Sequence, residues 1–154
     1  MTFYTRYPSP IGSLLLISDG SSLTGLTFGM PATGWNNQEN LSIFDSVKRW
    51  LDDYFAGKPK AVDFPLSMEG TDFQQRIWSL LVTIPYGETI TYGQLAQRLE
   101  RKMSAQAVGQ AVGKNPVAII IPCHRVVGAK GQLTGYAWGI EKKTWLLRHE
   151  EETK

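Results

Sequence analysis

The chain has 154 residues and a formal net charge of +2, and its 42% hydrophobic and 19% charged residues are typical of a folded rather than a disordered protein. Its single cysteine, Cys123, excludes an intramolecular disulfide framework and any zinc site built from several cysteines. With two histidines in all, no apolar run of membrane-spanning length and no secretory leader, we expect a cytoplasmic protein without a metal site or a membrane contact.

The first thirty residues predict β structure. GSLLLIS at 12–18 and LTGLTFG at 23–29 are short apolar segments, and the turn sequence DGSS at 19–22 separates them. Asp-Gly between two apolar segments favours a β-hairpin. The polar residues 30–40 that follow predict a loop.

A helix is expected over residues 41–56, where apolar side chains recur with helical spacing. Gly57 is suited to end this helix, and Pro59 prevents its continuation. Residues 58–70 then predict a linker with room for one short strand. We place a domain boundary near residue 68.

Residues 69–154 predict a mainly helical domain. Thr71 followed by Gln74 matches a capping box, in which two side chains satisfy the free amides at a helix N-terminus. Thr91 and Gln94 repeat this pattern. Each pair stands before apolar residues with helical spacing, so each predicts the start of a helix.

Two short helices, about residues 92–99 and 105–113, are expected to follow one another, with Ser104 as the cap of the second. Their spacing fits a helix-turn-helix, which DNA-binding proteins use and which other helical domains contain as a plain corner. The second helix lacks the Arg and Asn side chains that read bases in the major groove. Two explanations remain open: close packing within the protein, or insertion into the minor groove of DNA, where shape matters more.

The charge is distributed unevenly along the chain. Residues 1–69 contain five Lys and Arg against seven Asp and Glu, whereas residues 70–154 contain eleven against seven. This asymmetry suggests a polyanionic partner for the second half, although a solvated basic face would account for it equally well.

A last amphipathic helix is expected over residues 140–152, with Ile140, Trp145 and Leu146 on its apolar side. The glycine-rich residues 128–139 before it predict a loop.

Cys123 follows an apolar run and Pro122, and His124 and Arg125 come directly after it. A free cysteine in such a position is usually inert core, but a neighbouring base and a positive charge favour its nucleophilic thiolate. Adjacent residues of a strand point to opposite faces, so His124 reaches Cys123 only from a turn, from a helix start or through a water. A third group would orient the imidazole, and Glu150 is one candidate.

Several motifs together resemble one family. IPCHRVVG at 121–128 is similar to the active-site signature of the O6-alkylguanine-DNA alkyltransferases, the methylated-DNA–protein-cysteine methyltransferases. TDFQQRIW, IPYGETITYGQLA, AQAVGQAVGKNP and GYAWGIEKKTWLLRHE resemble the C-terminal domain of this family in order and spacing. The resemblance is strong over residues 70–151 and weaker over 1–69.

The resemblance implies an α+β fold. A small N-terminal α/β domain of the RNase H-like type, with its linker, would cover residues 1–68. A mainly helical domain with a helix-turn-helix would cover residues 69–154, bind DNA and accept the alkyl group.

The resemblance also implies direct-reversal DNA repair without a cofactor. A monomer would insert its helix-turn-helix into the minor groove of double-stranded DNA and flip out O6-alkylguanine, or alternatively O4-alkylthymine. The alkyl group would then move to Cys123 in one irreversible turnover. Glu150 would hold His124, which would take the proton of Cys123 through a water.

Further roles are carried over from the family by position. Tyr92 matches the tyrosine whose hydroxyl serves N3 of the base, and Asn115 matches the asparagine that shapes the turn near the cysteine. Lys143 is left with a role at the pocket edge or in the structure. The implied guanine-binding residues are Val126, Tyr136, Ala137 and Trp138. The implied DNA-binding residues are Ala105, Gln106, Ala107 and Gly109.

Two positions depart from the family pattern. Many members have Arg where Gln106 stands, and that arginine takes the place of the flipped base in the stack. Gln can hydrogen-bond the orphaned partner base but lacks the planar cation. Trp138 stands where many relatives have Gly, so we expect a narrower pocket that disfavours large adducts. The N-terminal half lacks the Cys and His ligands that bind zinc in some relatives.

Two other functions remain open at this point. The first is a non-catalytic protein that only binds alkylated DNA, but in such proteins another residue, commonly Trp, replaces the cysteine. The second is a helix-turn-helix regulator whose thiol is structural or redox-sensing.

Overall fold

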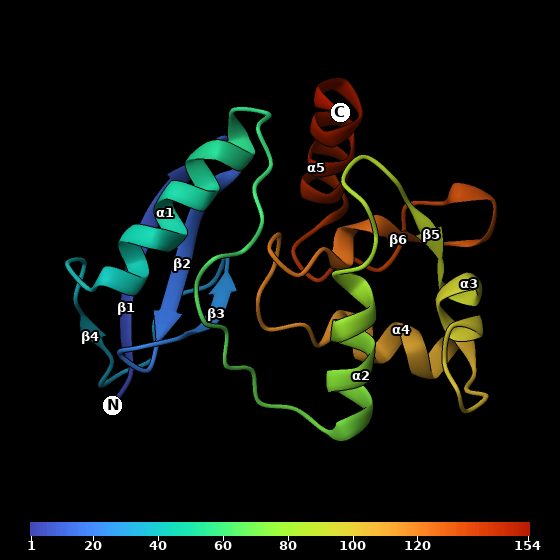
Figure 1. Ribbon diagram of the computed structural model, residues 1–154, viewed down its shortest axis with the longest axis horizontal. Coiled ribbons are helices and arrows are strands. Elements are labelled where there is room, and N and C mark those ends of the chain that lie inside the picture. The colour runs from blue at the N-terminus through green and yellow to red at the C-terminus, as the bar shows by residue number, and fades with distance from the viewer. The chain divides into compact units, whose positions relative to one another are not determined.

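The computed structural model describes residues 1–154, which form two compact units (Figure 1). The first unit contains Met1–Glu69 and Pro116–Ala118, and the second contains Gly70–Asn115 and Ile119–Lys154. One unit is built on a four-stranded sheet and the other is mainly helical, so the α+β class is confirmed. None of the helices combines the length and apolar character needed to cross a bilayer.

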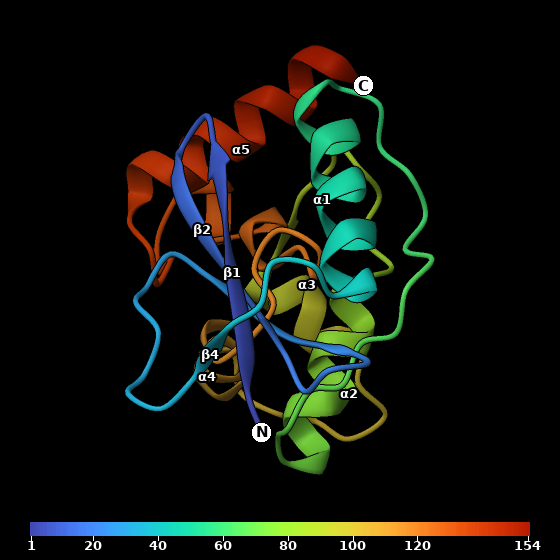
Figure 2. The same cartoon turned by 90° about the vertical axis from the view of Figure 1, so that its left-hand side faces the viewer.

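The sheet of the first unit has the strand order β3-β2-β1-β4. Its strands are β1 (Phe3–Ser9), β2 (Gly12–Ser18), β3 (Leu23–Thr27) and β4 (Asn36–Asn37). The predicted hairpin is confirmed as the antiparallel pair β2–β3. β1 also pairs antiparallel with β2, and the two lie side by side in Figure 2. β1 lies within the first thirty residues, where β structure is predicted, but its mixed sequence FYTRYPS lacks the apolar run that marks β2 as a separate strand.

Helix α1 (Ser42–Phe55) packs against β1, β2 and β3 as the apolar spacing predicts. It ends in the hydrogen-bond pattern of a Schellman motif. The Gly57 amide donates to the Tyr54 carbonyl (3.0 Å) and the Lys58 amide to the Asp53 carbonyl (2.9 Å). Gly57 has a φ of 78°, which a residue without Cβ adopts readily. The side chains that α1 buries are Ile43, Phe44, Val47, Trp50, Leu51 and Tyr54.

Two later segments pair with β3 outside the named strands. Leu66 forms an isolated parallel bridge with Leu23, and Val117 forms one with Leu26. The Leu26 amide donates to the Pro116 carbonyl at 2.9 Å. The short strand expected in the linker is therefore a single bridge. The sequence does not predict that residues 116–118 belong to the first unit.

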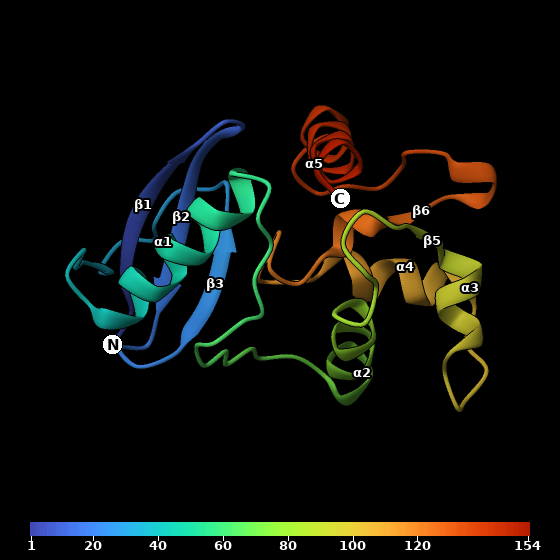
Figure 3. The same ribbon diagram turned by 45° about the horizontal axis from the view of Figure 1, so that its top comes forward.

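The second unit consists of helices that surround a small parallel sheet (Figure 3). Side chains cap three of its helices, as predicted. Thr71 and Thr91 each form both halves of a capping box, and Ser104 accepts a hydrogen bond from the Ala107 amide at 3.1 Å. The elements are α2 (Asp72–Leu81), β5 (Ile90–Thr91), α3 (Tyr92–Gln97), α4 (Ala105–Gly113), β6 (Val126–Val127) and α5 (Ile140–Thr153), with the 3₁₀ turns η1 (Cys123–Arg125) and η2 (Ala129–Gly131).

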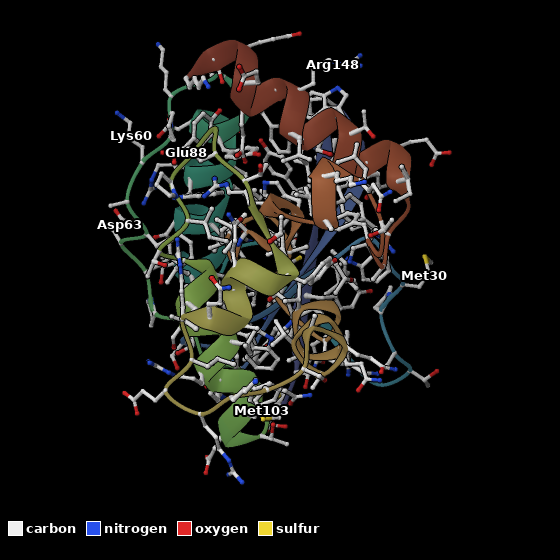
Figure 4. The ribbon with its side chains drawn as sticks, turned by 90° about the vertical axis from the view of Figure 1, so that its right-hand side faces the viewer. Met30, Lys60, Asp63, Glu88, Met103 and Arg148 are labelled. Carbon is white, nitrogen blue, oxygen red and sulfur yellow. The ribbon has the colours of Figure 1, made fainter.

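Helices α3 and α4 pack against each other as the predicted helix-turn-helix corner. Their connection carries Met103, which is labelled in Figure 4. The Trp78 indole of α2 donates a hydrogen bond to the Ala111 carbonyl of α4 at 2.9 Å. Gly109 of α4 lies over the Tyr92 ring, where a Cβ would come within 3.6 Å of it. Helix α4 is thus held from two sides.

The expected apolar face of α5 is partly wrong. Ile140 is 42% exposed, and the buried face consists of Lys143, Leu146 and Glu150. These three residues are spaced by three and four positions, so they do share one side of a helix. Two of them are charged, so a prediction based on hydropathy selects other residues of the helix as its buried face. Arg148 lies on the outer side of the helix (Figure 4).

Candidate active site

A tight turn presents Cys123. The Cys123 amide donates to the Ile121 carbonyl at 2.7 Å, and Pro122 between them has φ −81° and ψ 64°. These values define an inverse γ-turn. Asn115 Nδ2 donates to the same Ile121 carbonyl at 2.7 Å, so one side chain at the end of α4 holds the turn. Cys123 then begins the 3₁₀ turn η1, which is the kind of local structure that the sequence requires if the thiol and His124 cooperate.

The apolar run before this turn is buried but does not form a named strand. Ile119 within it has a φ of 71°, in the left-handed region that β-branched residues rarely adopt. Such a conformation costs about 1–3 kcal/mol and persists only where the surrounding structure imposes it. The path of the chain into Cys123 is therefore imposed by its surroundings rather than by local preference.

Three side chains form a buried network beside the thiol. His124 Nε2 lies 2.6 Å from Glu150 Oε2, and Arg125 Nε donates to Glu150 Oε1 at 2.7 Å. Arg125 Nη2 donates to Glu150 Oε2 at 3.1 Å. The side chain of Arg125 is also bound to the Ile84 carbonyl at 2.7 Å and lies over the Tyr86 ring. The network ties η1 to both α5 and the end of α2.

The network sets the protonation of its members. Burial alone would raise the pKa of Glu150, but the hydrogen bonds and charges of His124 and Arg125 outweigh it and lower that pKa. Burial lowers the pKa of His124 more than Glu150 raises it. The state that follows is an ionised Glu150 that accepts a hydrogen bond from the Nε2–H of a neutral imidazole. The buried Nδ1 of His124 has no protein partner and is left as the proton acceptor.

Arg125 does not act on the thiol as its position in the sequence suggests, because its guanidinium is bound to Glu150. The positive charge that acts on the thiol comes from Lys143. Cys123 itself is partly exposed to solvent. Burial raises its pKa, whereas a hydrogen bond from Asn115 and the charge of Lys143 oppose that rise. The thiol therefore needs a base before it can act as a nucleophile.

Lys143 is 1% exposed and spans two segments around the site. Its Nζ donates to the Val126 carbonyl at 2.7 Å and to the Thr134 carbonyl at 2.8 Å. Sequence reasoning left this residue without a definite role. The available signal was its spacing from Glu150 along α5, which places the two side chains on one helix face.

Two tyrosines lie within electrostatic reach of the thiol. The Tyr92 hydroxyl donates to the Thr134 carbonyl at 3.4 Å, and burial followed by the charge of Cys123 raises its pKa. Burial and the charge of Cys123 likewise raise the pKa of Tyr136. The Tyr136 hydroxyl is buried without a protein partner. Both tyrosines are therefore neutral donors at physiological pH.

The other expected guanine-binding residues occupy β6 and the loop before α5. Val126 is buried, and its carbonyl retains a second lone pair beside the bond from Lys143. Ala137 is exposed and Trp138 is half-buried, and both follow Tyr136 directly.

The expected DNA-binding residues lie on the outer side of α4. Ala105 and Gln106 are exposed, and Ala107 and Gly109 are half-buried. The interior side of the helix consists of Val108, Ala111 and Val112. The outer face is thus narrow, with Gln106 as its long side chain in the first turn. No group of three or more His, Cys, Asp and Glu side chains lies close enough together to hold a metal ion.

Two family models match the chain. The DNA binding domain of 6-O-methylguanine DNA methyltransferase matches residues 72–152, and the ribonuclease-like domain of the same name matches residues 2–68. The methylated-DNA–protein-cysteine methyltransferase of Haemophilus influenzae is 46% identical over 154 residues, which cover 97% of this chain and 86% of the relative. That of Mycobacterium tuberculosis is 46% identical over 98% of this chain and 93% of the relative.

Solved structures give the same result. The crystal structure of Mycobacterium tuberculosis OGT in complex with DNA superposes with a TM-score of 0.90 at 46% identity, over 98% of this chain and 94% of that one. The O6-methylguanine-DNA methyltransferase of the archaeon Pyrococcus kodakaraensis has a TM-score of 0.70 at 26% identity, over 97% of this chain and 99% of that one.

Proposed function

Because the chain belongs to the 6-O-methylguanine DNA methyltransferase family, we propose that Cys123 is its alkyl acceptor. The protein is a methylated-DNA–protein-cysteine methyltransferase, which repairs DNA by direct reversal of alkylation. Cys123 is the single cysteine of the chain. The observation that carries the assignment is the 2.6 Å contact between His124, the next residue, and the buried Glu150.

The thiol is activated by proton removal. Glu150 holds Nε2–H of His124, so Nδ1 is the nitrogen that takes a proton. A water between Nδ1 and Sγ carries that proton from Cys123 to the ring. The imidazolium that forms is stabilised by the charge of Glu150, and this makes the transfer favourable at the moment of reaction.

The transfer step is an in-line displacement at the alkyl carbon. The Sγ–carbon bond forms while the carbon–O6 bond breaks, and the bonding electron pair of the broken bond stays on the guanine. The Tyr92 hydroxyl protonates the guanine at N3 as this charge develops, and the imidazolium of His124 returns a proton to Tyr92. Guanine is restored, and Cys123 remains as a thioether with no route back, so each molecule acts once.

Asn115 and the pocket residues position the reacting groups. Asn115 holds the γ-turn and donates a hydrogen bond toward the thiol, so it keeps Sγ aligned with the incoming carbon. The second lone pairs of nearby carbonyls, including that of Val126, accept hydrogen bonds from the guanine edge. Tyr136, Ala137 and Trp138 form the wall that faces the alkyl group.

The DNA approaches through the outer face of α4, in the minor groove. The narrow face of Ala105, Ala107 and Gly109 lets the helix backbone come close to the sugar–phosphate walls. Gln106 enters the base stack and supports the flipped-out base. Extrusion of a base costs a few kcal/mol and costs less for a weakened pair, so alkylated guanine is favoured over intact guanine.

The protein acts as a monomer, since one chain supplies every group of this mechanism. The thiol must be reduced to act, and the cytoplasm provides a reducing environment. The single cysteine also distinguishes this chain from proteins that bind alkylated DNA without accepting the alkyl group.

The assignment is tested by the mass of the intact protein after incubation with double-stranded DNA that contains O6-methylguanine. We expect a gain of one methylene group, located on the peptide that carries Cys123. Cys123→Ser should show no gain and should retain DNA binding. A wild-type protein that is reduced and folded, yet shows no gain in mass, would contradict the proposal.

A further inference from the structure

Lys143 is a buried lysine that the mechanism above does not use. Its ammonium group has two partners, the carbonyls of Val126 and Thr134, and both are neutral. No carboxylate forms an ion pair with it. Burial of a cation without an anion is costly in free energy, so a negative charge that forms beside this ammonium group is strongly favoured.

The two carbonyls locate this charge. Val126 directly follows η1, the turn that begins at Cys123, and Thr134 lies two residues before Tyr136. Helix α5 packs against η1. The ammonium therefore lies between the turn that carries the thiol and the loop that carries the pocket wall.

The other charged groups around Cys123 already have opposite charges as partners. Arg125 on η1 is bound by Glu150 of α5, and Glu150 also binds His124. Tyr92 of α3 and Tyr136 of the loop are neutral donors. Lys143 is thus the cation near the thiol that no carboxylate neutralises.

We propose that Lys143 is a positioning residue whose ammonium group is the counter-charge of the Cys123 thiolate. The inference rests on the proposed function, since it assumes that the thiolate forms. The hydrogen bonds from Lys143 to the two carbonyls hold the ammonium group in place. Its charge then stabilises the thiolate that the water and His124 generate. Burial raises the pKa of Cys123 and lowers that of Lys143, and the charge of each group opposes the shift of the other.

The test titrates the thiol in the free protein, without DNA. The rate of alkylation of Cys123 by iodoacetamide is measured against pH for the wild type, Lys143→Arg and Lys143→Gln. Gln retains an N–H donor for a carbonyl but removes the charge. Loss of a nearby opposite charge raises a thiol pKa, so we expect Lys143→Gln to raise it by about one unit and to slow alkylation about tenfold below that pKa. Lys143→Arg should stay close to the wild type.

Lys142→Gln is the matched control, because it removes the same charge one residue earlier, from a half-exposed position. We expect no change in its thiol pKa. A folded Lys143→Gln protein with the wild-type pKa would overturn the proposal. So would an equal rise in both Gln variants, which would indicate a general effect of net charge.

If Lys143→Gln does not fold, the interaction between Lys143 and Cys123 is tested by changing Cys123 instead. The pKa of the Lys143 ammonium is measured by nitrogen NMR in the wild type and in Cys123→Ser. The wild-type value should be higher, because ionisation of the thiol favours the ammonium, and equal values would overturn the proposal. Methyl transfer from DNA is scored separately by mass, so a failure of the proposed function is distinguishable.

Discussion

At Glu150, one buried carboxylate receives donors from three places: His124, Arg125 and the Gly87 amide at 3.3 Å. These donors keep the carboxylate ionised although it is buried, whereas burial itself keeps the imidazole of His124 neutral. A neutral imidazole held through Nε2 is a base ready to act. The residue thus contributes to reactivity through its neighbours rather than by contact with the substrate.

Trp138 should determine the size of adduct that the protein accepts. On the proposed assignment of Trp138 to the pocket wall, its bulky ring leaves less room beside Cys123 than a glycine would. We expect Trp138→Gly to raise the rate of benzyl transfer relative to methyl transfer by about tenfold, which corresponds to about 1.4 kcal/mol. Single-turnover rates with O6-methylguanine and O6-benzylguanine DNA measure this ratio. An unchanged ratio would exclude Trp138 from adduct selection.

At the residue scale, the sequence predicted a cysteine, a histidine and a carboxylate that the fold brings together. These residue types were predictable because a nucleophile, a base and a group that orients the base each require one of them. It could not predict the role of Lys143, because a lysine on an amphipathic helix is usually solvated. The distribution of charge between Arg125 and Lys143 depends on contacts across the fold, which no local pattern contains.

At the scale of elements, helix starts were the most predictable feature. The side chains that cap α2 and α3 lie three residues apart in the chain, so the signal is local. The bridge between Val117 and Leu26 depends on pairing with a distant residue, and the sequence did not reveal it. Ile119 departs from its local preference for the same reason.

Helix α4 gives a prediction through Gln106. We expect Gln106→Arg to raise the affinity for double-stranded DNA several-fold, because a planar cation stacks in the gap left by the flipped base and adds a phosphate attraction. Binding is measured at several salt concentrations. Gln110→Arg adds the same charge to an exposed site of the same helix and should have a smaller effect. Equal gains from both variants would mean that charge alone acts, and no gain from Gln106→Arg would contradict the role of this position.

Gly109 tests whether α4 needs to be narrow. An added Cβ would lie 3.6 Å from the Tyr92 ring, an ordinary contact, so Gly109→Ala should fold. Alanine is more favourable than glycine inside a helix by about 1 kcal/mol, so the melting temperature should not fall. DNA affinity should drop at least several-fold if the added methyl group, packed between α4 and Tyr92, keeps the helix backbone from its close approach to the groove. Unchanged affinity in the stable variant would argue against close approach at Gly109.

At the scale of the whole molecule, stability should fall in acid. The pKa of folded His124 lies below its ordinary value of 6.5, so the unfolded chain binds more protons once the pH falls below 6.5. The pKa of Glu150 is also lowered from 4.5, because His124 and Arg125 outweigh its burial, so its contribution is present above 4.5 and lost as the pH falls further. The free energy of unfolding, measured by urea denaturation, should therefore decline from about pH 6.5 downward.

Glu150→Gln isolates the second part of this decline. The variant should lose about 3 kcal/mol at neutral pH, because Arg125 stays buried without its anion, and its stability should depend less on pH below 4.5. Glu152→Gln, an exposed neighbour on the same helix, should stay within about 0.5 kcal/mol of the wild type. A Glu150→Gln protein as stable as the wild type would show that the network contributes no net stability.

The pairing of residues 116–118 with β3 has a consequence for modularity. The Leu26 amide donates to the Pro116 carbonyl, and the Ala118 amide donates back to the Leu26 carbonyl at 3.0 Å. Five residues later comes the thiol. A chain that began after residue 69 would therefore leave residues 116–118, which lead toward Cys123, without the β3 strand that they pair with. Gene fusions or truncations that discard residues 1–69 therefore remove the pairing partner of a segment that lies far beyond them in the sequence.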